Sequence, residues 1–288
     1  MDKKILNQLI KVQQREITEY NVYLSLSKHL TTKNAKILKN IAKQEKYHYE
    51  ILKSITKKDV APSKLKIFLY VLIAKIFGLN FTLQLMEIGE RNAQSFYQSI
   101  SSKSKEIKVL KIINDETKHE KKLITLIDEK RLNYIGAFVL GLNDALVELT
   151  GALAGLTLAL NSTKIIAMVG LITGIAASMS MGVSNYLAAK EEGDKNPKLT
   201  GLITSMAYTI TVIILIMPYL VINQSLIALI FTLILAILII ASFTFYVSVV
   251  KLDKFIPRFL RMAIISLSVA IINFAIGFLI KNFFGIDI

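Results

Sequence analysis

The chain has 288 residues and no cysteine. This absence excludes disulfide bonds, thiolate metal ligands and catalysis by a thiol. Proline and glycine are scarce, with 4 and 13 occurrences, and histidine occurs only three times. Because histidines are so few, the positions at which they stand carry information about a metal site.

Two further patterns are missing. Asp2 and the polar run Lys3–Asn7 are not followed by a continuous apolar core, so we expect no signal peptide and a cytoplasmic N-terminal part. Lys and Arg exceed Asp and Glu by 14, but they form no basic stripe interleaved with aromatic residues. We therefore expect no nucleic-acid partner and attribute the excess charge to attraction toward anionic lipid headgroups.

Charged residues are unevenly distributed along the chain. Of the 35 basic residues 25 precede Arg131, and so do 14 of the 21 acidic residues. The sequence therefore predicts two domains, a soluble one over residues 1–130 and a membrane domain over residues 131–288. The expected fold is all-α, with an N-terminal four-helix bundle followed by a five-helix transmembrane bundle.

Five stretches of the second half are long and apolar enough to cross a bilayer. They are Tyr134–Leu160, Ile165–Ala189, Leu199–Ile222, Leu226–Val250 and Phe259–Lys281. Basic residues gather before the first stretch and in the second and fourth links, which predicts that these segments are cytoplasmic. The chain is thus expected to be a multi-pass protein of the cell membrane, with its N-terminus inside and its C-terminus outside.

The first two spans differ in composition from the others. They are rich in Gly, Ala and Ser, which lets helices approach closely, whereas spans three and four are rich in Ile and Leu and are expected to face lipid. Asp144 and Glu148 lie four residues apart in span one and so share one helix face. An ionisable side chain within the hydrocarbon region costs free energy, so this pair indicates a function. Met181 and Asn185 have the same spacing in span two. A methionine in a membrane helix is usually a packing residue, but a thioether near carboxylates also suits a transition metal.

Apolar positions in residues 1–130 recur every three or four residues, as expected for helices. The predicted helices are Lys3–Leu30, Asn34–Thr56, Phe81–Ser101 and Lys105–Lys130. An apolar run with interspersed lysines, Leu65–Leu79, lies between the second and third. This run is interpreted either as the crossover of a bundle or as an interfacial helix on the membrane domain.

Two of the three histidines share one local pattern, Glu45-x-x-His48 and Glu116-x-x-His119. The other two helices supply Glu16 and Glu87, with Glu90 one turn later. One Glu from each of two helices, with Glu-x-x-His from each of the other two, is the arrangement of di-iron carboxylate proteins. We therefore predict a site for two iron ions or another divalent pair, such as Mn²⁺ or Zn²⁺.

A single Glu-x-x-His on a helix could arise by chance, because exposed helices are rich in Glu. Two copies that use two of three histidines are far more specific. Three further glutamates lie close to the predicted site in the sequence. They are expected to be solvated, with a role as an accessory metal ligand as the alternative; they are Glu19, Glu50 and Glu120.

Residues 1–130 resemble the rubrerythrin-type branch of the ferritin-like superfamily. The resemblance rests on the run from Glu16 to Tyr23, on the two Glu-x-x-His motifs and on Glu87-x-x-Glu90. It implies a ferritin-like bundle with a di-metal site.

Residues 131–288 resemble the vacuolar iron transporter family through Gly141–Glu148 in span one and Ser180–Tyr186 in span two. The combination is similar to bacterial and archaeal membrane-bound ferritin proteins, which export iron. The resemblance implies that Asp144 and Met181 line the ion pathway and that the chain forms a homodimer with the pathway between the two copies of span one.

The sequence departs from that family at three places. Thr173 stands where the family usually has a Glu two turns before the Met, and Asn185 stands where a Glu often precedes the Tyr. The link Lys190–Lys198 is also much shorter than the Glu-rich cytosolic region of well-studied members. We therefore expect the N-terminal domain to replace that region as the metal collector.

These patterns lead to one main hypothesis and two alternatives. The main one is a transporter that exports Fe²⁺ or Mn²⁺ in exchange for protons, because a carboxylate in the membrane can alternate between a metal ion and a proton. It allows ferroxidase activity at the di-iron site. The alternatives are a membrane-anchored di-iron oxidase or peroxidase and a soluble metal sensor that gates the bundle.

Overall fold

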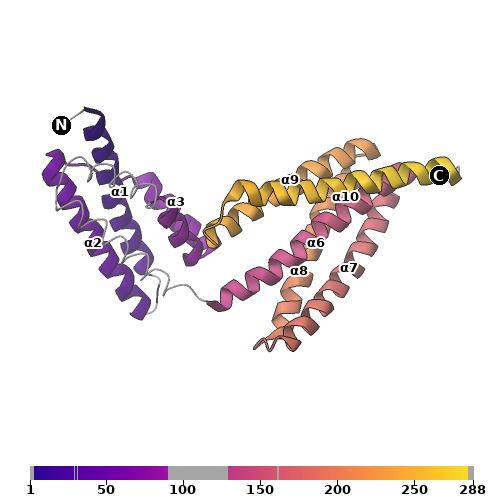
Figure 1. Ribbon diagram of the computed structural model, residues 1–288, viewed down its shortest axis with the longest axis horizontal. Coiled ribbons are helices and arrows are strands. Elements are labelled where there is room, and N and C mark those ends of the chain that lie inside the picture. Colours follow the sequence, from indigo (N-terminus) through magenta and orange to yellow (C-terminus); the bar gives the residue numbers. More distant parts are fainter. Residues whose placement is uncertain (1–2, 29, 31, 90–128, 161, 285–288) are drawn as a thin grey trace. The chain divides into compact units, whose positions relative to one another are not determined.

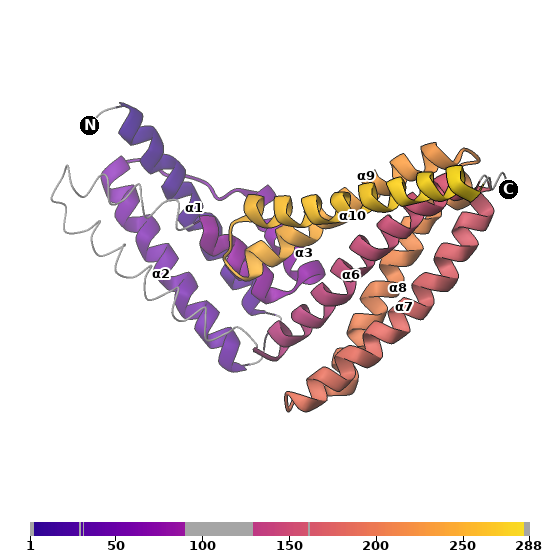
Figure 2. The same ribbon diagram turned by 45° about the vertical axis from the view of Figure 1, so that its right-hand side comes forward.

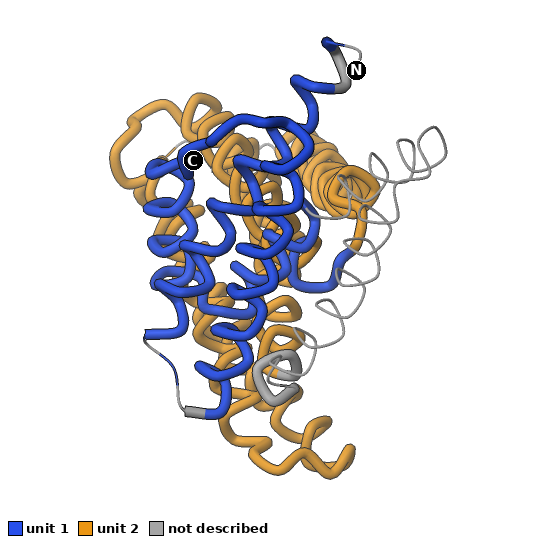
Figure 3. Tube along the Cα trace, turned by 90° about the vertical axis from the view of Figure 1, so that its left-hand side faces the viewer, with its two compact units in different colours: residues 1–128, 249–252 blue, residues 129–248, 253–288 orange. Residues whose placement is uncertain are grey.

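A computed structural model of the chain describes residues 3–28, 30, 32–89, 129–160 and 162–284. All regular elements among these residues are helices, which agrees with the predicted all-α class (Figure 1). The chain divides into two compact units. Unit 1 comprises residues 1–128 with 249–252, and unit 2 comprises residues 129–248 with 253–288 (Figure 3).

Unit 1 begins with a helical hairpin. Helices α1 (Lys3–Ser27) and α2 (Thr32–Thr56) pack side by side along their length (Figures 1 and 2). A further helix, over residues 79–89, adds Leu83 and Met86 to the same apolar core. The two predicted N-terminal helices are therefore confirmed. Predicted helix Lys105–Lys130 and the second half of Phe81–Ser101 lie almost wholly outside the described residues, so the four-helix bundle remains a prediction.

The run predicted as Leu65–Leu79 forms helix α3 (Lys64–Phe77). The Ser63 side chain caps its first turn by accepting a hydrogen bond from the Lys66 backbone N–H. The helix ends at Gly78, whose φ of 88° is a conformation that glycine adopts without steric cost. The helix over residues 79–89 follows at once, so the apolar run is a separate short helix between two others.

Unit 2 contains five long helices: α6 (Glu129–Ala159), α7 (Thr163–Glu191), α8 (Pro197–Val221), α9 (Ser225–Val250) and α10 (Phe255–Phe284). Each contains a stretch that is long and apolar enough to cross a membrane. Their positions confirm the five predicted spans to within a few residues. Helix α6 is the central one, because it packs against α7, α8 and α10.

The link between α7 and α8 is short and well defined. Gly193, with φ 76°, follows the end of α7, and Pro197 opens α8. The Asp194 carboxylate accepts hydrogen bonds from the Thr200 hydroxyl at 2.6 Å and from the Asn196 backbone N–H at 3.1 Å. These bonds, led by that from Thr200, hold the pKa of Asp194 below its usual range.

Small residues set the spacing between the membrane helices. A Cβ on Gly277 of α10 would overlap the carbonyl oxygen of Gly155 on α6, and a Cβ on Gly155 would lie 3.0 Å from the carbonyl oxygen of Asn273. A Cβ on Gly141 would likewise overlap the Thr204 carbonyl oxygen on α8. The prediction that small residues of span one permit close helix packing is therefore confirmed.

We predict that Gly277→Ala separates α6 from α10 and destabilises unit 2 by about 1–3 kcal/mol, as overpacking of a tight contact usually does. Thermal unfolding in detergent measures this as a lower midpoint. Gly136→Ala is the matched control, because a Cβ at Gly136 meets nothing within 4 Å. An equal loss for both variants would contradict the close-packing explanation.

The expectation that span three faces lipid is wrong. Helix α8 buries a full face that includes Thr204, Tyr208 and Tyr219. The Ile and Leu residues that suggested a lipid-facing helix occupy its other side, where Ile210 and Ile213 are exposed. The hydroxyl groups on the buried side need hydrogen-bond partners inside unit 2. Helix α8 therefore belongs to the interior of the unit.

Candidate functional site

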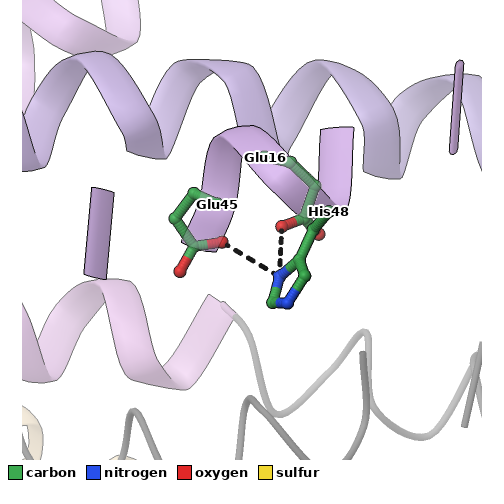
Figure 4. A group of neighbouring side chains, drawn as sticks. All are labelled: Glu16, Glu45 and His48. Atoms are coloured by element: carbon green, nitrogen blue, oxygen red, sulfur yellow. Dashed lines mark ion pairs between the residues drawn. The ribbon is translucent and has the colours of Figure 1, made fainter. Parts of the chain in front are cut away.

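Unit 1 holds a buried cluster of three potential metal ligands. Glu16 of α1 and Glu45 and His48 of α2 each offer one ligand atom, and these atoms lie within 4.8 Å of one another. His48 Nδ1 lies 3.6 Å from a Glu16 oxygen and 3.5 Å from a Glu45 oxygen (Figure 4). All three residues have 0% exposure. The hairpin of α1 and α2 thus brings together residues that lie about thirty positions apart.

The burial of these groups follows from helix periodicity. Glu45 and His48 are separated by three residues and share the face of α2 that packs against α1. Taking two carboxylates out of water is costly unless a cation compensates them. Carboxylate oxygens and an imidazole nitrogen are ligands that iron, manganese and zinc ions accept. The three residues therefore fit one divalent metal ion.

Arg15 links this cluster to the rest of unit 1. Its guanidinium lies 3.5 Å from Glu16 and 3.4 Å from Glu19, and it donates a hydrogen bond of 3.0 Å to the Gly89 carbonyl. The helix over residues 79–89 is thereby attached beside the cluster. The expectation that Glu19 is solvated is wrong, because Glu19 is 4% exposed and its charge is compensated by Arg15.

The remaining predicted ligands have different outcomes. Glu87 is buried, at 4% exposure. It is not one of the three residues whose ligand atoms lie within 4.8 Å of one another. Glu90, Glu116 and His119 lie outside the described residues, as does Glu120. Glu50 is exposed, as expected. The structure thus brings together Glu16, Glu45 and His48, and the di-metal site as a whole stays a prediction.

In unit 2 the two intramembrane carboxylates lie on one face of α6. Asp144 is half-buried and Glu148 is exposed on the surface of the unit. The Tyr208 hydroxyl of α8 donates a hydrogen bond of 2.7 Å to Glu148 Oε2. An exposed carboxylate within a helix of this apolar character must meet something more polar than lipid tails.

Ion passage beside these carboxylates, which the sequence analysis expects, predicts that Tyr208→Phe reduces metal flux about tenfold while leaving the protein folded. The variant removes one hydrogen bond to a carboxylate, worth about 1.5 kcal/mol, and 1.4 kcal/mol corresponds to a factor of ten. Flux into proteoliposomes measures the effect. Tyr219→Phe is the control, because that hydroxyl bonds to Thr157 at 2.6 Å on the same pair of helices. Equal flux losses would show that the effect comes from helix packing.

The candidate residues of span two lie on α7. Asn185 donates a hydrogen bond of 2.6 Å to the Thr204 hydroxyl, which faces the carbonyl oxygens of Ala137 and Thr200 at 3.1 Å. Asn185 therefore helps to join α7, α8 and α6. Met181 is half-buried and packs against the apolar core of unit 2. Thr173 is exposed and bonds to the Val169 carbonyl oxygen of its own helix.

Two residues at these sites were missed by the sequence analysis. Tyr208 stands in an apolar span, and a buried tyrosine hydroxyl needs a partner, so its presence could have indicated a polar contact there. Arg15 precedes Glu16 and stands four residues before Glu19, a spacing that favours an ion pair on a helix.

Comparison with known proteins adds one finding. Residues 135–198 match the VIT family. The matched segment spans most of α6, all of α7 and the link to α8, and it includes Asp144, Glu148, Met181 and Asn185. No curated protein matches the chain. This match does not extend to residues 1–130, so the ferritin-like resemblance of that half stays a prediction.

Proposed function

We propose that the chain transports a divalent metal ion, Fe²⁺ or Mn²⁺, across a membrane and that unit 1 captures the ion before transport. The buried group Glu16, Glu45 and His48 carries this proposal, since it is a metal-ligand set in a chain with five apolar helices. The VIT-family similarity of residues 135–198 supports transport of iron or a related ion as the role of unit 2.

In this proposal the capture site would hold two ions. Glu16, Glu45 and His48 would hold the first, and the other predicted ligands, Glu87, Glu90, Glu116 and His119, would complete the site for the second. Carboxylates stabilise the divalent ions and the two imidazoles fix their geometry. The buried position of Glu87 agrees with a place in this interior.

Asp144 and Glu148 form the ion pathway, with Met181 and Asn185 on the neighbouring helix. A carboxylate that exchanges a metal ion for a proton couples the two movements. The exposed side of Glu148 supports a homodimer, because a second copy of α6 would cover this charge with another carboxylate pair and enclose the ion between them.

The orientation follows from the basic residues in the links. Lys190, Lys195 and Lys198 lie between the second and third spans, and the link after the fourth span carries Lys251 and Lys254. Basic links favour the cytoplasmic side. Unit 1 then lies in the cytoplasm and unit 2 in the cell membrane, so that transport from unit 1 through unit 2 is export.

The test is metal flux by the full chain in proteoliposomes that contain a metal-sensitive dye and a pH dye. Transport predicts Mn²⁺ accumulation accompanied by a proton signal, both absent from protein-free vesicles. If no metal moves while the same protein consumes oxygen or peroxide with Fe²⁺, the chain is a membrane-anchored oxidase and the proposal fails.

A further inference from the structure

Helix α3 (Lys64–Phe77) is apolar on two opposite sides. Its inner side packs on the core of unit 1 through Ile67, Tyr70, Val71 and Ala74. Its outer side consists of Leu65, Phe68, Leu69, Leu72 and Ile76, which are all exposed, with Leu65 at 68% and Ile76 at 64%. A helix that is apolar all round is normally covered on all sides, so the outer side requires an occupant.

The helix is held firmly on unit 1. The Ser63 backbone N–H donates to the Thr18 hydroxyl of α1 at 3.0 Å, and the Gln14 side chain donates to the Ala61 carbonyl at 3.2 Å. These bonds fix the segment that leads into α3. The outer side is therefore a fixed apolar surface, and its exposure does not result from a detached helix.

The charges of α3 indicate what covers this side. The helix has three lysines and no acidic residue. At about 100° per residue, Lys64 and Lys75 lie along one border between the two apolar sides, and Lys66 lies along the other. Lysines on both borders of an apolar face can extend toward phosphate groups while the face enters the acyl region.

We propose that α3 lies in the plane of the membrane interface, with Leu65, Phe68, Leu69, Leu72 and Ile76 in lipid and its lysines on the phosphates of anionic headgroups. The same chain contains five candidate spans, so a bilayer is always within its reach. Lysines near an anionic surface add electrostatic attraction to the apolar contact.

The absence of native cysteine allows a direct test. Single variants Leu65→Cys, Phe68→Cys and Leu72→Cys of the full chain carry a spin label in nanodiscs of zwitterionic lipid with or without anionic lipid. Collisions with oxygen, which concentrates in lipid, are compared with collisions with a water-soluble nickel complex. Glu50→Cys, on the exposed face of α2, is the control.

The proposal predicts high oxygen and low nickel accessibility at all three α3 positions and the reverse at Glu50→Cys. Changing Lys64, Lys66 and Lys75 to Glu is expected to shift the labels toward water most strongly in anionic nanodiscs. High nickel accessibility in α3 would overturn the proposal, as would low accessibility to both reagents, which marks burial against protein. Spin–spin broadening would identify a second copy as the occupant. This readout is independent of metal transport.

Discussion

Replacing Asp144 by Asn is expected to reduce metal flux about sixtyfold or more. A divalent ion within the hydrocarbon region needs negative charge beside it, and an unbalanced charge there costs at least about 2.5 kcal/mol. Each 1.4 kcal/mol is a factor of ten. The amide keeps the size of the carboxylate but not its charge, so the initial rate of Mn²⁺ entry into proteoliposomes measures the electrostatic contribution.

A carboxylate outside the spans serves as the control. Glu192 follows the end of α7 and is exposed, so Glu192→Gln is expected to retain the wild-type rate. The double variant Asp144→Asn with Glu148→Gln is expected to show no flux above protein-free vesicles. Flux that survives the loss of both carboxylates would remove them from the pathway.

Replacing Glu45 by Gln is expected to abolish most of the stabilisation of the protein by metal ions. A ligand that binds only the folded state at a hundred times its Kd stabilises it by about 2.7 kcal/mol. Glu45 contributes one of three clustered ligand atoms, and the amide substitutes a weaker, neutral oxygen for the carboxylate. Thermal unfolding with and without Mn²⁺ gives the shift, and metal analysis gives the number of ions bound.

The matched variant is Glu50→Gln, on the same helix but exposed. It is expected to keep the full metal-induced shift. The unfolding midpoint of Glu45→Gln without metal separates lost binding from lost folding, and we expect it to equal or exceed that of the wild type, because a buried charge has been removed. If Mn²⁺ raises the unfolding midpoint of Glu45→Gln as much as that of the wild type, this cluster is excluded as the binding site.

The two kinds of site were predictable from sequence to different degrees. Glu16, Glu45 and His48 could be grouped in advance, because the three-residue spacing in α2 places two of them on one face and a helical hairpin brings α1 beside it. The five spans could be placed because their apolar length is a local property of the chain.

Side-chain contacts between helices that lie far apart in the sequence could not be predicted. The contact of Tyr208 with Glu148 depends on which face of α8 turns toward α6, and an Ile- and Leu-rich composition does not specify that rotation. Burial of Glu19 depends likewise on Arg15, whose guanidinium also reaches the carbonyl of Gly89. Such contacts are set by tertiary packing, which a single sequence read by periodicity does not contain.

The central claim is that unit 1 captures the ion that unit 2 carries. The most direct measurement is the initial rate of Mn²⁺ flux against Mn²⁺ concentration for wild type and Glu45→Gln in matched proteoliposomes, with the unit 1 side facing the metal. Capture by unit 1 predicts that Glu45→Gln needs more Mn²⁺ for half-maximal flux but reaches the wild-type maximum. Superimposable curves would contradict it, because the buried cluster would then have no part in supplying the transported ion.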